Sequence, residues 1–237
     1  MLGMANRAGQ NGTGGDDTAA GGDPLAADSG FSERQNEVIE VALRLLMEGG
    51  EKALTTAALA RAANCSKESL YKWFGDRDGL LAAIVAQQAS RVRIIDSAAL
   101  PKTPAQFADA LRLFAEDLLT VLLSESSLAL NRLCVGAVRG EDAGVGAVLL
   151  ERGKRRIEER ARRLLEAGRA GGHIVFDDAA GAYRALYGLI IGDLHIRALL
   201  GEQSAVSDLS IGERARAAVA QFLTLYAPAD AGANTQT

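Results

Sequence analysis

The sequence predicts an all-α protein, with an N-terminal three-helix domain that contains a helix-turn-helix and a larger helical domain behind it. Apolar residues recur at helical spacing from residue 38 onward, and residues typical of helix caps precede these stretches. Only 4 of the 237 residues are proline, and the 48% hydrophobic residues are mostly Ala, Leu, Val and Ile. This composition favours helices, since Ala and Leu lose little entropy there. No stretch alternates cleanly enough to predict a strand.

Composition narrows the functional classes. The formal charge of −4 excludes a polycation, so any contact with nucleic acid must be local. Cys65 and Cys134 make neither a disulfide framework nor a zinc site. We expect no metal and no cofactor. The sequence shows no signal peptide and no apolar run near the roughly 18 residues of a membrane span, so we expect a cytoplasmic protein without a membrane partner.

The pattern divides the chain into four parts. Residues 1–30 are rich in Gly and Asp and have no aromatic residue, so they are predicted to be a disordered tail. Residues 31–92 form the first domain, whose helix-turn-helix lies at 55–74. Residues 93–227 form the larger helical domain, and 228–237 a second disordered tail.

Polar residues mark where the helices of the first domain begin. The expected N-caps are Ser32, Thr55, Ser66 and Asp76. Gly49-Gly50 is expected to end the first helix and Gly75 the third. Asn64 lies in the tight turn before the third helix, where a residue that accepts left-handed geometry is needed.

The third helix has one apolar and one polar side. Leu70 and Phe74 lie one turn apart and are expected to point inward. The outward residues are Lys67, Glu68, Ser69, Tyr71 and Lys72. Positive charge and hydrogen-bonding groups on so short a helix suit a probe of the DNA major groove.

Thr55 to Leu80 resembles the TetR-family signature: a Thr-led helix with an Ile/Leu-Ala pair, then Val-Ser-x-x-x-Leu-Tyr-x-x-Phe, then a Lys or Arg and a Leu. The matching residues are Leu59-Ala60, Ser66, Leu70-Tyr71, Phe74, Arg77 and Leu80. The helix from Val38 to Met47 also resembles the family's first helix. Two positions depart from the signature: Asn64 replaces the usual Gly and Cys65 the usual Val.

The resemblance implies a DNA-binding transcriptional regulator whose ligand-responsive homodimer represses from a palindromic operator in double-stranded DNA. The resemblance implies phosphate contacts for Thr55, Tyr71, Trp73 and Arg77. It implies base-edge contacts for Lys67, Glu68, Ser69 and Lys72, and Thr56 is a further expected DNA-binding residue. Structural roles remain as alternatives. Tyr71 and Trp73 can simply pack, Glu68 can stabilise its own helix start, and Arg77 can be a solvated charge.

The second domain reads as a series of amphipathic helices. The expected helices begin at Pro104, cover 127–138 and 146–168, run from Asp177 to about Leu200, and end with 211–226, with a break at Gly171-Gly172. The helix 177–200 is apolar nearly all round, so it must be covered on both sides. We therefore expect homodimerisation through about 177–200 and 211–226, where Gly181, Gly188 and Gly192 allow close helix approach. The alternative is an internal core helix in a monomer.

The region 127–200 loosely resembles the AefR-like subgroup of TetR C-terminal domains, which implies a small-molecule pocket. The pocket candidates are Phe107, Leu111, Phe114, Leu118, Leu130, Asn131, Cys134 and Tyr187. Ordinary core packing is the alternative for most of them. Asn131 needs a partner if it is buried. His195 is expected to be a hydrogen-bonded interface histidine, and Cys134 an inert buried thiol rather than a redox sensor.

Two other classes of function compete with this interpretation. An enzyme lacks support, because the chain has two histidines and no nucleophile motif, metal cluster or complete glycine fingerprint. A DNA-binding protein without an effector leaves the large second domain unexplained. We therefore expect a regulator and not an enzyme.

Overall fold

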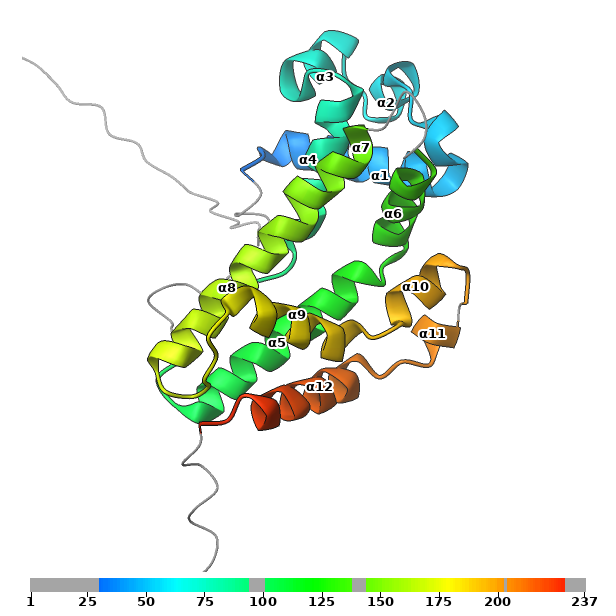
Figure 1. Ribbon diagram of the computed structural model, residues 1–237. Helices are drawn as coiled ribbons and strands as arrows, with labels where there is room; N and C mark the ends of the chain where they lie inside the picture. The colour runs from blue at the N-terminus through cyan, green and yellow to red at the C-terminus, as the bar shows by residue number, and fades with distance from the viewer. Residues whose placement is uncertain (1–29, 94–100, 138–143, 203, 229–237) are drawn as a thin grey trace, which may run out of the picture.

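The computed structural model describes residues 30–93, 101–137, 144–202 and 204–228, and every regular element within them is a helix (Figure 1). In chain order these are α1 (Glu33–Ala53), α2 (Thr56–Ala62), α3 (Lys67–Phe74), α4 (Arg77–Ser90), α5 (Pro104–Leu122), α6 (Glu125–Ala137), α7 (Gly144–Val148), the π-helical η3 (Leu149–Lys154), α8 (Arg155–Ala170), α9 (Ala179–Ile191), α10 (Leu194–Leu199), α11 (Ser204–Ser207) and α12 (Ile211–Leu225). The all-α fold class is confirmed. The two predicted tails lie almost wholly outside the described residues.

Two hydrophobic cores hold the helices together. The N-terminal core joins α1 to α4 and includes Leu130 and Cys134 from the second half of α6. The C-terminal core joins α5, α8, α9 and α12, with the end of α4 contributing Ala89 and Val92. Since α4 and α6 each contribute to both cores, they connect the two parts of the molecule.

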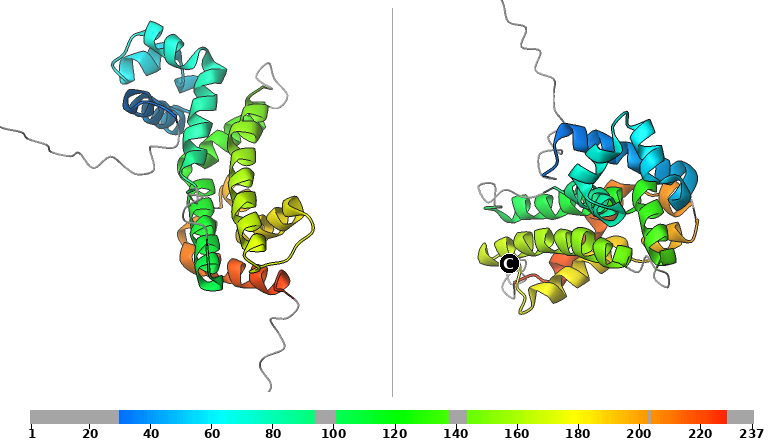
Figure 2. Two further views of the ribbon diagram at one scale, coloured as in Figure 1. Left: turned by 90° about the vertical axis from the view of Figure 1, so that its left-hand side faces the viewer. Right: turned by 90° about the horizontal axis from the view of Figure 1, so that it is seen from above.

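The helix-turn-helix and the last helices occupy opposite ends of the molecule. Figure 1 shows α2 and α3 at one end and α9 and α12 at the other. The long helix formed by α7, η3 and α8 runs beside α4, which leads from α3 into the larger domain (Figure 2). The α4 helix is therefore the direct connection between α3 and the larger domain.

The expected helix 177–200 is wrong as a single element. The chain breaks at Gly192, whose φ of 53° is a left-handed conformation that favours glycine, and α10 then begins at Leu194. The N-cap of α9 is Asp178 rather than Asp177, because the Asp178 carboxylate accepts hydrogen bonds from the amides of Ala180 and Gly181. The expected helix 146–168 begins earlier, at Gly144, and contains the unforeseen π-helical segment η3.

Among the described residues, no single helix is long and apolar enough to cross a membrane. Only α5 and α6 taken together reach that length and composition, across a bend of 62°.

Candidate nucleic-acid interface and ligand cavity

The helix-turn-helix is formed by local hydrogen bonds that the sequence predicted. Thr55 caps α2 by accepting from the Ala58 amide at 3.1 Å, and Ser66 caps α3 by accepting from the Ser69 amide at 3.0 Å. Asn64 has a φ of 49° and is the one described non-glycine residue with positive φ. The turn geometry expected for this residue is confirmed.

Arg34 on α1 stabilises the same turn, and sequence reasoning missed it. Its guanidinium donates to the carbonyl oxygens of Ala63 at 2.5 Å and Asn64 at 3.1 Å. These two carbonyls lie at the end of α2 and have no partner within the helix. The arginine therefore supplies the hydrogen bonds that they lack. Only the packing of α1 across the turn reveals this role.

The α3 helix is anchored on one side and open on the other. Leu70 and Phe74 are 5% and 8% exposed and belong to the N-terminal core, whereas Tyr71 is 58% exposed. Lys67, Glu68 and Lys72 are also exposed, and Ser69 is half-buried with its hydroxyl 3.0 Å from that of Ser66. A short helix thus presents two cations, a carboxylate and a phenol to solvent.

The geometry of α3 bears on the structural alternatives for Trp73 and Glu68. Trp73 is half-buried, packs against the N-terminal core and meets the Phe74 ring edge-on at 6.3 Å between centroids. Packing therefore accounts for much of its side chain. Glu68 is not the N-cap of α3, since the Ser66 hydroxyl fills that position.

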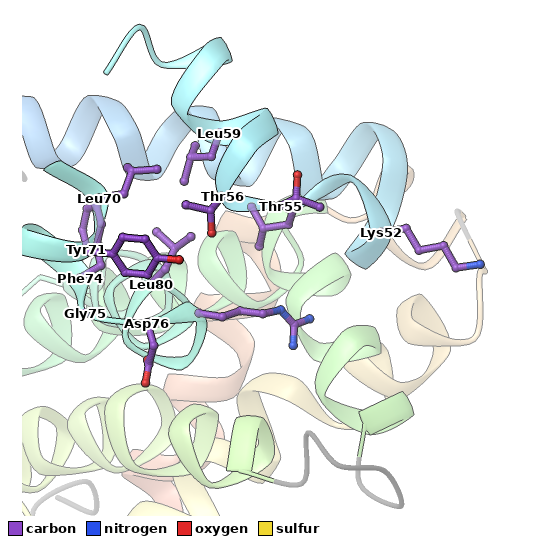
Figure 3. Close-up of a pocket in the computed structure, with 12 residues that line it drawn as sticks. Lys52, Thr55, Thr56, Leu59, Leu70, Tyr71, Phe74, Gly75, Asp76 and Leu80 are labelled. Carbon is purple, nitrogen blue, oxygen red and sulfur yellow. The ribbon is translucent and has the colours of Figure 1, made fainter. Parts of the chain in front are cut away.

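A cleft of about 590 Å³ opens beside α3, between the starts of α2 and α4. Figure 3 shows Thr55 and Thr56 at the start of α2 and Tyr71 from α3 around this hollow, with Lys52 further out. Arg77 also lines it. Asp76 is engaged as the N-cap of α4, accepting from the Gly79 amide at 2.8 Å. The cleft therefore combines hydroxyl donors with two cations, a combination that suits a phosphate group.

The predicted pocket residues separate into two groups. Four of them, Phe107, Leu111, Phe114 and Leu118, lie inside the C-terminal core, where the Phe107 ring stacks on His173 at 5.6 Å. Cys134 lies in the N-terminal core, and burial raises the pKa of its thiol, as an unreactive thiol requires.

The other three candidates, Leu130, Asn131 and Tyr187, line a cavity of about 270 Å³ between the two cores. Its walls come from α4, α5, α6, η3, α8, α9 and α10. Asn131 donates to the Ser127 carbonyl at 2.8 Å, so its amide has a partner within its own helix.

Sequence reasoning missed four polar residues of this cavity: Gln88, Ser127, Lys154 and His195. Within the described residues of one protomer the buried Nε2 of His195 has no hydrogen-bond partner, so the hydrogen bond expected for this histidine stays a prediction about the dimer. Burial, and then the charge of Lys154, lower its pKa. The imidazole is therefore neutral at neutral pH.

A row of polar side chains leads from this cavity to α1. Ser126 donates to Gln88 at 3.2 Å, Gln88 to Gln87 at 3.5 Å, and Gln87 to Asn36 on α1 at 3.4 Å. Both glutamines are buried on α4. Because buried amides need partners, these hydrogen bonds link the side chains of the cavity wall to α1.

The C-terminal end of α4 is tied to the larger domain. Arg160 of α8 donates to the carbonyls of Ala89 and Val92, both at 2.6 Å. Arg93 forms a two-bond ion pair with Asp117 of α5, at 2.7 and 2.8 Å. These contacts hold one end of α4, whereas its other end carries the helix-turn-helix.

Comparison with known proteins agrees with this architecture. Residues 38–84 match the profile described as bacterial regulatory proteins of the tetR family, and residues 109–228 match the AefR-like transcriptional repressor, C-terminal domain. The chain is 57% identical to a TetR transcriptional regulator from Agrobacterium tumefaciens, covering 83% of this chain and 95% of that one, with a TM-score of 0.71. No curated protein matched the chain.

Two further solved structures are similar. The flavonoid-responsive regulator FrrA is 26% identical, covers 83% of this chain and 98% of its own, and has a TM-score of 0.61. A TetR-family regulator from Mesorhizobium loti is 22% identical over 82% of this chain and 97% of its own, with a TM-score of 0.66, and supports the fold alone.

The fold and its open α3 helix define a DNA-binding transcriptional regulator of the helix-turn-helix class. The chain belongs to the TetR family, with a C-terminal domain of the AefR-like type.

Proposed function

We propose that this protein is a cytoplasmic repressor that binds a palindromic operator as a homodimer and is released by a small molecule in the cavity. The observation that carries the proposal is α3, anchored by Leu70 and Phe74 and open on its polar side. The AefR-like profile is that of a repressor, and FrrA, a relative, is flavonoid-responsive.

The interface divides into base-reading and phosphate-binding groups. Lys67, Glu68, Ser69 and Lys72 lie on α3 for the base edges, where Lys donates to guanine and Glu accepts from cytosine. Thr55, Thr56, Tyr71 and Arg77 surround the cleft and take phosphates, and Trp73 adds its N–H beside them.

Among the three glycines expected at the interface, Gly188 gives the strongest support for dimerisation through α9 and α12. Gly181 is explained within the chain, since a Cβ there would lie 2.9 Å from the capping Asp178 carboxylate, and Gly192 by its positive φ. Gly188 is exposed in the middle of α9, and a Cβ there would meet nothing within 4 Å. Close packing of a second helix against α9 would explain why this position is a glycine. Exposed Ala217, Ala220 and Leu225 on α12 extend the same kind of surface.

Ligand release follows from where the cavity lies. Val85, Gln88 and Ala89 of α4 line it, and α4 continues at its other end into α3 through Gly75 and Asp76. A ligand that fits only one position of α4 changes the spacing of the two α3 helices in a dimer. It thereby shifts the population away from the state that binds DNA.

The test begins with selection of bound duplexes from a random-sequence library, followed by fluorescence anisotropy on the recovered operator. We expect an inverted repeat whose half-sites are about 34 Å apart, one turn of DNA. Non-palindromic sites, or no enriched sequence, would contradict the dimeric arrangement.

Matched charge removals then test the interface. Lys72→Ala on α3 is expected to weaken binding at least about 5-fold, as loss of a base contact of about 1 kcal/mol or more would. Arg163→Ala, at an exposed position of α8, removes the same charge from a helix at a distance from α3 (Figure 1) and should leave binding unchanged. Equal effects of both variants would indicate bulk electrostatics and refute the assignment.

A further inference from the structure

The cavity between the two cores carries a chemical preference that no comparison assigns. Its polar side chains fall into two sets: the neutral Gln88, Ser127 and Asn131 on α4 and α6, and the set formed by Lys154, Tyr187 and His195 on η3, α9 and α10. The second set contains a charge, and the first does not. This preference rests on the proposed function, since it concerns the ligand of that same cavity.

The second set is electropositive and has hydrogen bonds to give. The Lys154 ammonium lies 5.3 Å from the centroid of the Tyr187 ring and forms no ion pair with any described residue. The Nε2 of His195 is buried without a partner in the described part of the chain. Burial raises the pKa of Tyr187, so its phenol keeps its proton and remains a donor. Lys154 is exposed and its ammonium is hydrated, so the cost lies with the buried Nε2 of His195, which stays unsatisfied unless a ligand completes it.

No carboxylate balances this charge from the cavity wall, as far as the described residues show. Three acids lie near this set in sequence, and none of them lines the cavity: half-buried Glu158 of α8 acts on Tyr183, and the other two have basic neighbours. Glu151 pairs with Arg155, and Asp193 lies 3.8 Å from Arg197. A cationic ligand would therefore meet repulsion here, whereas an anion would meet an open partner.

The rest of the wall is aliphatic. Val85, Val121, Leu130, Leu149 and Ile157 line it, and Tyr187 is its one aromatic side chain among the described residues. Gly153 permits η3 to approach α4 closely, since a Cβ there would lie 3.1 Å from the Val85 side chain. The volume of about 270 Å³ is just below the range of ordinary small-molecule sites, about 300–1,000 Å³, so the ligand must be small.

We propose that the cavity binds an anionic amphiphile: a small molecule with an apolar body and a single anionic head, such as a carboxylate, held by Lys154 and His195. The body lies against the aliphatic wall next to α4. The head accepts from the ammonium and from an imidazole tautomer that carries its proton on Nε2.

Two series of matched probes test the head-group preference at pH 7.5 by isothermal titration calorimetry. One series has a flexible body (decanoate, decanol, decylammonium), and the other a flat one (2-naphthoate, 2-naphthylmethanol, 2-naphthylmethylammonium). In at least one series we expect the carboxylate to bind about 10-fold or more tightly than the alcohol, and the ammonium to bind least. Equal affinities, a preference for the ammonium, or no binding of any probe would overturn the proposal.

Substitutions at Lys154 test whether this residue causes the preference for a carboxylate head group. Lys154→Met keeps an apolar side chain of similar length at this exposed rim position, and it should abolish the advantage of the carboxylate over the alcohol. Lys154→Arg should retain it. Arg152→Met, on the same π-helical segment but outside the cavity, removes the same charge and should change nothing. Loss of the preference in Arg152→Met as well would assign it to the net charge of the protein and refute the site.

The same probes separate this inference from the proposed function. The anisotropy of the selected operator complex is followed as each bound carboxylate is added. Release of DNA by the carboxylate supports both proposals. Preferred binding without release leaves the chemistry of the cavity standing and overturns ligand-controlled repression. Release by all three head groups alike leaves the repression standing and overturns the anionic preference.

Discussion

Replacement of Gly188 by alanine separates the monomer from the dimer, because the expected effects on them have opposite signs. Within one chain the new methyl group meets nothing within 4 Å, and the φ of Gly188 is not positive. An interior helical glycine costs about 1 kcal/mol relative to alanine, so Gly188→Ala should stabilise an isolated protomer by about that amount.

Against a closely packed second helix the same methyl group is an obstacle. Overpacking costs about 1–3 kcal/mol at one site, and a two-fold interface places the substitution on both sides. The dimer should therefore lose at least about 2 kcal/mol, which is about a 30-fold rise in the dissociation constant.

Sedimentation equilibrium over a range of concentrations measures the dissociation constant, and urea unfolding at low concentration measures the stability of the protomer. Gly136→Ala is the matched control, since Gly136 is exposed on α6 and a Cβ there also meets nothing within 4 Å. It should leave the dimer unchanged. If Gly188→Ala stabilises the protein and the dimer is as tight as before, α9 does not pack closely against its counterpart.

Three further predictions concern single side chains. Gly168→Ala should lose about 1–3 kcal/mol of stability in urea, because its methyl would lie 2.3 Å from the buried Phe107 ring; an unchanged midpoint would contradict this. Ser66→Ala should lose about 1 kcal/mol, and Ser66→Asp, which can still cap α3, should lose less; equal losses would exclude capping as the cause. The third concerns His195. Burial and the charge of Lys154 lower its pKa in the folded protein, so the unfolded chain takes up a proton first as the pH falls through about 6.5. Folded stability should therefore fall less between pH 8 and pH 5.5 in His195→Gln than in the wild type, and equal changes in melting temperature would disprove the cause.

The first domain could be predicted closely because its signals are local. A cap bonds to an amide two or three residues away, as at Thr55 and Ser66, and the spacing of Leu70 and Phe74 fixes which side of α3 is buried. None of these depends on a distant partner. Arg34, which satisfies the carbonyls of the turn from α1, depends on tertiary packing and was missed for that reason.

The second domain was predicted less well because helical periodicity shows that a face is buried but not what covers it. Phe107 and Leu130 have the same pattern and both are buried, yet only Leu130 also lines the cavity. The break at Gly192 was hidden by apolar residues that continue beyond it, although Gly-Asp at that point was a usable signal. The place of His195 on the cavity wall was not foreseen because α10 was taken as a continuation of α9.

The attachment of α4 at its C-terminal end has a mechanical consequence. The helix has 14 residues and is therefore about 20 Å long, and Arg160 holds the end that lies near the cavity. Val85, on the cavity wall, is five residues or about 7.5 Å from that end, whereas the first residue, Arg77, is about 20 Å away. A rigid rotation about the held end thus gives roughly a 2.5-fold lever ratio. A displacement of about 1 Å at Val85 becomes about 2.5 Å at the start of α4, a large part of the roughly 3.4 Å between successive base pairs.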